Sequence, residues 1–187
     1  MDIRAKILTS CRGLARERGF RGLNMDSLAA RAGVSKRTVY RYFPGKDALI
    51  EAALEDFMQQ MAGEVARIMQ EESQPTRILC ALQKYLFLHG QFIINPHSLR
   101  DLKEHYPHLW HKIDRFRLEQ VGAVLAFISA KRGAAAASDI DPRIAAAVIL
   151  NSIQAVLNPD FVVENNLTFE EAAQQVSRLL MDGFLSR

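Results

Sequence analysis

Residues 24–47 read NMDSLAARAGVSKRTVYRYFPGKD and contain two short helical patterns joined by a glycine turn. Asn24 suits the N-cap of the first pattern, and Gly33 supplies the left-handed residue that ends it. Ser35 can cap the second pattern, which stops before Pro44. These signals predict a helix-turn-helix unit in this segment.

The second helical pattern has an apolar inner face and a polar outer face. Val39 and Phe43 are four residues apart and so face inward, which turns outward the side chains of Lys36, Arg37, Thr38, Tyr40 and Arg41. An α-helix fits the major groove of B-DNA, where Arg and Lys pair with guanine edges and phosphate contacts fix the register. The pattern therefore predicts a DNA recognition helix over residues 35–43, with a solvated basic helix that only packs as the alternative.

Positive charge is concentrated in the same part of the chain. Residues 1–47 contain 11 Lys and Arg against 4 Asp and Glu, a net charge of +7, whereas residues 48–187 contain 13 against 17, a net charge of −4. A local basic excess of this kind is typical of a module that binds phosphates. The mildly acidic remainder is expected to have a different role.

Residues 32–46 carry alanine-glycine-valine-serine, then threonine, tyrosine, a second aromatic residue, phenylalanine and lysine. This order closely resembles the DNA-binding domain of TetR-family transcriptional regulators. The resemblance implies that Lys36, Arg37 and Arg41 are candidates for reading bases, with Thr38 touching a base or a phosphate. The further candidate DNA contacts are Asn24, Ser35, Tyr40, Tyr42 and Lys46. Arg37 stands where many relatives have a small residue, so it either reads a guanine or adds a phosphate contact.

Helical periodicity continues through almost the whole chain, and no segment shows the alternation of a strand. We expect an all-α fold of about nine helices. A three-helix DNA-binding domain is predicted over residues 1–47. The resemblance implies that residues 48–187 form an effector-binding and dimerisation domain. A long helix from about Lys46 to Glu72 is expected to connect the two domains.

Prolines and capping residues give the expected helix boundaries after residue 72. We expect Pro75 to open a helix that Pro96 closes. Asp141 is expected to cap a later helix, and Pro159 to stop it. The predicted helix boundaries therefore rest mainly on how each proline is interpreted.

Some functions and locations are disfavoured by what the sequence lacks. No apolar run approaches the ~20 residues needed to cross a bilayer, and residues 1–6 lack the apolar core of a signal peptide. We therefore expect a cytoplasmic protein with no membrane partner. There is no glycine-rich phosphate loop, nucleophile elbow or paired-cysteine zinc motif, so neither an enzymatic activity nor a cofactor is expected. Cys11 and Cys80 are predicted to be small core residues rather than a disulfide.

Histidines gather in one part of the sequence, at His97, His105, His108 and His111. The last three recur every three residues, which allows a metal site to be imagined. Pro107 interrupts the helix between the first two of these three, so regular ligand geometry on one face is not expected. We predict a polar, partly exposed helix connection and no metal, with a metal site as the alternative.

The segment between the DNA-binding unit and the C-terminal helices is rich in large side chains. In TetR-like regulators the equivalent helices enclose a pocket for a small effector, and the aromatic content favours an apolar or aromatic molecule. The candidate lining residues are Phe57, Tyr85, His89, Phe92, Trp110, Phe116, Phe127, Asn151 and Gln154. His89, Asn151 and Gln154 are expected on apolar faces, where buried polar groups need partners. Ordinary core packing, with backbone carbonyls or water as those partners, is the alternative.

The last two helical patterns are apolar over most of their circumference, which suggests two contact surfaces on each helix. One surface would face the protein's own core, and the other would face a second copy in a four-helix dimer interface. The candidate interface residues are Ile144, Val148, Ile149, Val176, Leu180 and Phe184. Complete burial within a monomer is the alternative.

Together these patterns predict a homodimeric transcriptional regulator that binds double-stranded DNA at a palindromic operator. The resemblance favours a repressor that leaves the operator when a small-molecule effector binds, although the residues do not distinguish a repressor from an activator. Two other functions stay open. One is a constitutive DNA-binding protein without an effector, and the other is a ligand-binding helical module with weak DNA binding.

Overall fold

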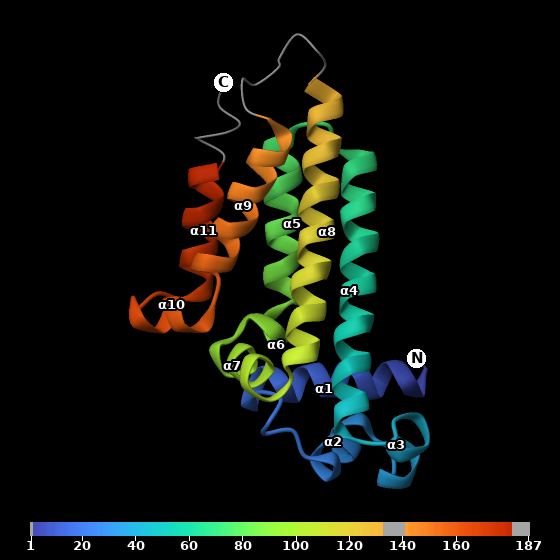
Figure 1. The fold of residues 1–187 in the computed structure, drawn as a ribbon. Helices are drawn as coiled ribbons and strands as arrows, with labels where there is room; N and C mark the ends of the chain where they lie inside the picture. Colours follow the sequence, from blue (N-terminus) through green and yellow to red (C-terminus); the bar gives the residue numbers. More distant parts are fainter. Residues whose placement is uncertain (1, 133–140, 181–187) are drawn as a thin grey trace. The chain divides into compact units, whose positions relative to one another are not determined.

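Eleven helices are present among residues 2–132 and 141–180, which are the residues that the structure, a computed structural model, describes. Those two ranges contain no strand, so the described chain is all-α as its periodicity predicts (Figure 1). None of the described helices is both long enough and apolar enough to span a membrane.

The chain divides into two compact units, which we call the first unit and the second unit. The first unit comprises residues 1–60 and 89–111, and the second comprises residues 61–88 and 112–187. This division differs from the boundary expected after Asp47. Residues 48–60 and 89–111 group with the first unit, so a segment that begins 47 residues after the end of α3 belongs to the same body as the helix-turn-helix.

The first unit is built from α1 (Ile3–Arg18), α2 (Met25–Ala32), α3 (Lys36–Tyr42), the start of α4 (Lys46–Glu71), α6 (Gln91–Ile94) and α7 (Pro96–His105). Its core combines α1 with the helices that follow it, through side chains that include Ile7, Leu28, Val39 and Leu49. On the inner side of α1, Ile7, Cys11 and Leu14 are buried, whereas Ile3 at its start is exposed.

Three phenylalanines extend this core to α6. The Phe92 ring lies edge-on to Phe20, with ring centroids 6.3 Å apart, and edge-on to Phe57, with centroids 5.3 Å apart. All three are buried, and burial of such a side chain contributes about 1.5–3 kcal/mol. This packing explains why α6, which is far from α1 in sequence, belongs to the first unit.

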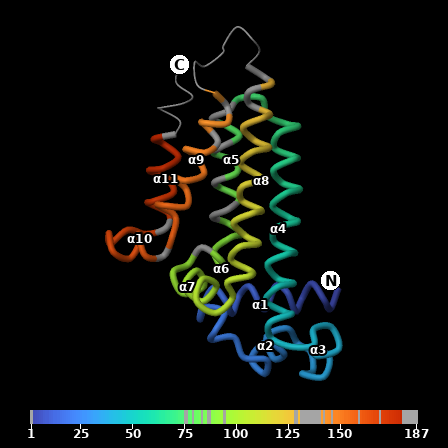
Figure 2. The backbone as a smooth tube through the Cα atoms, in the orientation of Figure 1, coloured from blue at the N-terminus to red at the C-terminus, as the bar shows by residue number. Residues whose placement is uncertain are grey.

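The second unit contains the rest of α4, most of α5 (Pro75–His89) and α8 (Pro107–Arg132), and then α9 (Pro142–Val156), α10 (Pro159–Glu164) and α11 (Phe169–Leu180). Val65 and Ile68 of α4 pack with Ile78 of α5 and Val124 of α8 in one buried cluster. In the C-terminal part α9 packs against α10 and α11, and α9 and α11 lie side by side (Figure 2).

The helix end predicted at Pro96 is wrong, because this proline opens a helix instead of closing one, whereas α9 ends at Val156, shortly before Pro159 as predicted. The helix that begins at Pro75 ends at His89, and Pro96 is the first residue of α7. Asn95 caps α7 by accepting a hydrogen bond from the Ser98 backbone N–H at 2.9 Å. In the same way Pro159 opens the short helix α10. A proline fits the first turn because that turn leaves its N–H groups unpaired anyway. The additional short helices α6 and α10 account for eleven helices where about nine were expected.

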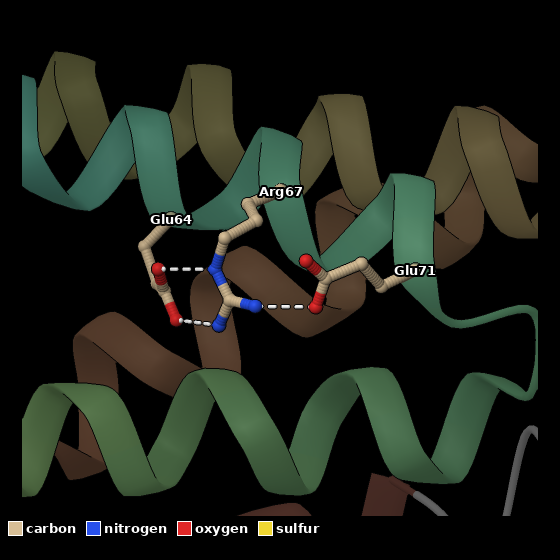
Figure 3. A network of polar contacts seen from close by, with 3 residues as sticks. All are labelled: Glu64, Arg67 and Glu71. Atoms are coloured by element: carbon tan, nitrogen blue, oxygen red, sulfur yellow. Dashed lines mark hydrogen bonds and ion pairs between the residues drawn. The ribbon is translucent and has the colours of Figure 1, made fainter.

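Ion pairs line the exposed surface of α4 within the second unit. Figure 3 shows the Arg67 guanidinium between the Glu64 and Glu71 carboxylates, which lie three residues before it and four residues after it. These hydrogen bonds raise the pKa of Arg67. Exposed pairs at this spacing stabilise a helix only slightly, so we assign this network a local role in the long helix α4.

The two cysteines have different environments. Cys11 is buried in the first-unit core, and burial raises the pKa of its thiol to about 12. Cys80 is exposed, so the prediction that it is a small core residue is wrong. Its position in α5 turns the thiol away from the cluster that contains Ile78.

Candidate nucleic-acid interface

The helix-turn-helix has the predicted cap and turn geometry. The Asn24 side-chain oxygen accepts a hydrogen bond from the Asp26 backbone N–H at 2.7 Å and so caps α2. Gly33 ends α2 in the left-handed conformation, with φ of 66° and ψ of 36°. The backbone N–H of Val34 then bonds back to the Ala29 carbonyl at 3.0 Å. These contacts close the turn within two residues and fix the direction in which α3 leaves it.

α3 is held at both ends. The Ser35 hydroxyl accepts a hydrogen bond from the Thr38 backbone N–H at 3.0 Å, and a cap of this kind is worth about 1 kcal/mol. Val39 is completely buried and Phe43 is 4% exposed, so both anchor the inner face of the helix in the first-unit core. The predicted inward and outward faces of α3 are therefore confirmed.

The outer face of α3 is basic and hydrogen-bonding. The exposed side chains on or next to it are Lys36, Arg37, Tyr40, Arg41 and Tyr42. No Asp or Glu occurs anywhere between Ser27 and Lys46. The Arg41 guanidinium carbon lies 5.5 Å from the centre of the Tyr42 ring, which keeps the cation beside the aromatic face. This surface can donate several hydrogen bonds to an anionic partner.

Several of the candidate DNA contacts already have partners within the chain. The Lys36 ammonium donates to the Asp26 carboxylate at 3.0 Å, and this hydrogen bond raises the pKa of Lys36. The Thr38 and Ser35 hydroxyl oxygens are 2.8 Å apart and share a hydrogen bond. Lys36 would therefore have to exchange Asp26 for DNA, whereas Arg37 and Arg41 extend from the helix without a carboxylate on α3 beside them.

Lys46 has a different environment from the other candidates. It is the first residue of α4 and is half-buried. Its ammonium donates to the Arg21 backbone carbonyl at 2.7 Å. The structure thus places Lys46 in a contact inside the first unit, and the sequence contained no signal for that contact.

One basic residue near the end of α3 was missed. The Arg4 guanidinium carbon, from α1, lies 5.9 Å from the centre of the Phe43 ring. Arg4 is exposed, so it adds a positive charge beside the end of α3. The only sequence signal was the local excess of Lys and Arg, which does not identify individual contacts.

The predicted effector-pocket residues are divided between the two units. Phe57 and Phe92 pack against each other and are buried in the first unit. Phe92 also lies on α6, not on the helix that carries Tyr85, because that helix ends at His89. His89 and Trp110 fall in the first unit as well. These positions follow from the break between α5 and α6, which the sequence pattern did not show.

Five of the predicted pocket residues lie in the second unit, but two of these are on its surface. Tyr85, Phe116 and Phe127 are half-buried, and Phe127 packs against the Val124 cluster. Asn151 and Gln154 are exposed on α9, so the expectation that they are buried polar groups is wrong. The Asn151 side-chain amide instead donates to the Ala147 carbonyl one turn earlier, at 2.7 Å.

The predicted dimer residues fall into two groups. Ile144 and Val148 are 59% and 44% exposed on one stripe of α9. Ile149 and Val176 are buried within the second unit and leave little of their side chains exposed on its surface. Leu179 of α11 was not predicted and is 70% exposed. The Leu180 side chain and Phe184 lie outside the part of the chain that the structure describes.

The histidines do not gather into a metal site. His97, His105, His108 and His111 are all exposed. His105 is near Glu104, with the two charged groups 3.8 Å apart. Among the described residues, no three His, Cys, Asp or Glu side chains lie close enough together to hold a metal ion.

The helix-turn-helix segment is similar to a known protein family. Residues 7–53 match the family described as bacterial regulatory proteins, tetR family. A relative from Bacillus subtilis (strain 168), described as the uncharacterized HTH-type transcriptional regulator YvaF, is 28% identical over 180 residues, which cover 95% of this chain and 93% of the relative. The matched residues contain all of α2 and α3 and the core that holds them.

Solved structures share the fold over nearly the whole chain. The transcriptional regulator FadR from Bacillus subtilis, in complex with stearoyl-CoA, has a TM-score of 0.69 at 18% identity, and the match covers 96% of this chain and 98% of FadR. A TetR transcription regulator from Haloarcula marismortui has a TM-score of 0.72 at 19% identity, with 97% of both chains covered. Residues 7–53 thus resemble the DNA-binding part of tetR-family regulators, the chain as a whole is similar to an HTH-type transcriptional regulator, and the solved structures share its fold.

Proposed function

We propose that the chain is a sequence-specific repressor that binds double-stranded DNA through α3. The observation that carries this proposal is the exposed basic face of α3, which stands on the buried Val39 and Phe43. Arg37 and Arg41 have the reach and the donor geometry to pair with guanine edges in the major groove. Tyr40, Tyr42 and Asn24 would contact phosphates and set the register.

Dimerisation through α9 would give the regulator its two-fold symmetry. Ile144, Ala147 and Val148 are exposed at spacings of three and four residues, so they form one apolar stripe on α9. Leu179 adds an exposed apolar side chain on α11, which packs beside α9. A second copy would bury this surface in an isologous interface. Two recognition helices about 34–36 Å apart would then read the two halves of a palindrome.

A small molecule bound in the second unit would release the DNA. The half-buried Tyr85, Phe116 and Phe127 make this unit suited to an apolar or aromatic molecule. The FadR structure, which shares the fold, holds stearoyl-CoA. Release would be a population shift, in which the effector binds more tightly to a dimer that fits DNA poorly. We also propose that residues 1–47 bind DNA, that residues 48–187 bind the effector and form the dimer, and that the protein is cytoplasmic.

Selection of bound sequences from a random DNA pool tests the DNA-reading part. We expect the full-length protein to enrich a palindrome and to bind it about 10³-fold or more above random DNA at physiological salt. Binding should also weaken linearly in log[salt], as phosphate contacts require. Weak binding with no enriched sequence would instead favour the ligand-binding helical module.

Thermal denaturation against a metabolite library tests the effector part, with stearoyl-CoA as the first probe. We expect at least one compound to raise the Tm and also to release the selected operator, because linkage couples the two effects. If no compound weakens operator binding, the chain is a constitutive DNA-binding protein. That result would leave the DNA-reading proposal intact.

A further inference from the structure

A closed set of polar contacts joins three parts of the first unit, and we call it the polar ring. Asp101 of α7 accepts a hydrogen bond from the Arg21 backbone N–H, with a distance of 2.7 Å from Oδ2 to N. The carbonyl of the same residue, Arg21, accepts from Lys46 Nζ at 2.7 Å. Asp47, the neighbour of Lys46, accepts a hydrogen bond from the Tyr106 hydroxyl. Asp101 and Tyr106 are five residues apart, so the chain itself closes the ring.

The polar ring lies near the surface of the first unit and is only partly shielded from solvent. Asp101, Lys46 and Tyr106 are each half-buried, whereas Arg21 and Asp47 are exposed. Burial and the nearby Asp47 and Asp101 carboxylates raise the pKa of Tyr106 to about 12. The Tyr106 hydroxyl therefore keeps its proton, and its ability to donate to Asp47, over the whole physiological pH range.

α7 is fixed firmly against the end of α1, which gives the ring a rigid base. Ser98 is fully buried, and its hydroxyl donates to the Ala15 carbonyl at 3.2 Å. At Gly19 a Cβ atom would lie only 2.5 Å from the Asp101 carboxylate. Gly19 also has a φ of 71°, a conformation that favours glycine. The residue that ends α1 thus allows α7 to approach the backbone closely.

The ring lies next to the recognition helix along the chain. α3 ends at Tyr42, and only residues 43–45 separate it from Lys46. The ring also lies where two long helices begin, because α4 starts at Lys46 and α8 starts at Pro107, directly after Tyr106. Both of these helices continue into the second unit. A change in the start of either helix would therefore alter the contacts of the ring.

We propose that Asp101 and Tyr106 are positioning residues for DNA binding, which hold the connection before α2 and the start of α4 so that α3 is correctly oriented. On this interpretation Lys46 acts mainly inside the protein, through Arg21, and not at a DNA phosphate. The inference rests on the proposed DNA binding. The inference also gives α7, which lies outside the helix-turn-helix, a role in DNA binding.

Electrostatics and positioning predict opposite signs for Asp101. As a negative charge in a basic unit, Asp101 by itself opposes binding to DNA, so its removal should tighten binding. As a positioning residue, its removal should weaken binding. Asp101→Ala removes both the charge and the acceptor. Asp101→Asn removes the charge but keeps an oxygen that can accept from the Arg21 N–H.

The experiment measures operator affinity of the full-length protein by fluorescence anisotropy, with the Tm of each variant recorded. We expect Asp101→Ala to weaken binding about tenfold, which is ordinary for a residue in a contact network. Asp101→Asn should retain most of the affinity, although it removes the same negative charge as Asp101→Ala. Glu104→Ala is the matched control, because Glu104 is an exposed carboxylate on the same helix and outside the ring. Its variant should bind as tightly as wild type or slightly more tightly.

Tyr106→Phe provides a second test that leaves the charge unchanged and removes only the hydroxyl. We expect this variant to stay folded and to bind the operator several-fold more weakly. The inference is overturned if folded Asp101→Ala binds as tightly as wild type, or if the Ala and Asn variants behave alike. Should Asp101→Ala not fold, wild-type affinity in Tyr106→Phe would overturn it. If wild type selects no DNA sequence, the proposed function itself fails, and the two failures are thus distinguishable.

Discussion

The exposed face of α3 and the exposed face of α9 are both single stripes along a helix, but their chemistry is opposite. The α3 stripe carries Lys36, Arg37 and Arg41, whereas the α9 stripe carries Ile144 and Val148. The basic side chains of the α3 stripe are exposed to water, and Lys36 also pairs with the Asp26 carboxylate. Exposed apolar side chains grouped on one stripe gain most from burial against another apolar surface.

This difference indicates which kind of partner each surface suits. A charged face with flexible donors suits a hydrated, anionic partner such as DNA, where phosphates and base edges replace water. An apolar face suits a second protein surface of the same kind. In a two-fold dimer, the same face of the second copy of the chain provides that surface. Changing the chemistry of either stripe should therefore affect one partner directly and the other only through dimerisation.

The largest effect is expected from placing a charge on the α9 stripe. Val148→Asp should convert the dimer to monomers, because two unpaired carboxylates would have to be buried in the interface at a cost of about 3 kcal/mol or more. Operator binding should then fall to the level of a single half-site. Sedimentation velocity and anisotropy on the same sample measure the two consequences together.

Val163→Asp is the matched control for this substitution. Val163 is 49% exposed, compared with 44% for Val148, but it lies on α10. The control variant should remain dimeric and bind the operator as wild type does. A dimeric Val148→Asp protein, or equal dissociation of both variants, would show that α9 does not form the interface.

A smaller effect is expected from removing one arginine from the α3 stripe. Arg41→Ala should weaken operator binding by about 1–3 kcal/mol and relax the preference at one base position. The protein should stay dimeric, because α3 has no part in the apolar stripe. Repeating the sequence selection with the variant identifies the relaxed position.

Arg67→Gln tests whether any lost arginine has the same effect. Arg67 is an exposed arginine of α4 in the second unit, held between two glutamates, and its removal should leave affinity and sequence preference unchanged. If Arg41→Ala weakens all DNA sequences equally, Arg41 contacts a phosphate and does not read a base.

The α3 surface could be predicted from sequence because its determinants are local. Asn24, Gly33 and Ser35 each act within a few residues of themselves, so their caps and turn appear in the structure as expected. The inward direction of Val39 and Phe43 follows from helical spacing alone. Once this inward direction is known, the basic character of the outer face can be read directly from the neighbouring residues in the sequence.

The effector pocket and the dimer surface could not be predicted in the same way, because they depend on contacts between distant segments. Phe92 was assigned to the helix of Tyr85, but a break at Gly90 and packing against Phe20 place it in the first unit. On α9, apolar residues occur on several sides, so spacing alone did not tell Ile149, which is buried, from Val148, which is exposed. Asp101 had no sequence signal, since its partner is a backbone N–H that lies 80 residues earlier.

The smallest effect is expected from freeing one lysine of the α3 stripe. In the free chain Lys36 donates to the Asp26 carboxylate, which competes with DNA for the same ammonium. Asp26→Asn should remove that competition and a negative charge together, so we expect operator affinity to rise a few-fold, most strongly at low salt. Glu17→Gln is the control for the charge alone, because Glu17 pairs with Arg31 of α2 and not with a residue of α3. Equal gains in the two variants would mean that Lys36 gains nothing from its release, and unchanged affinity in Asp26→Asn would mean that Lys36 stays outside the DNA contact.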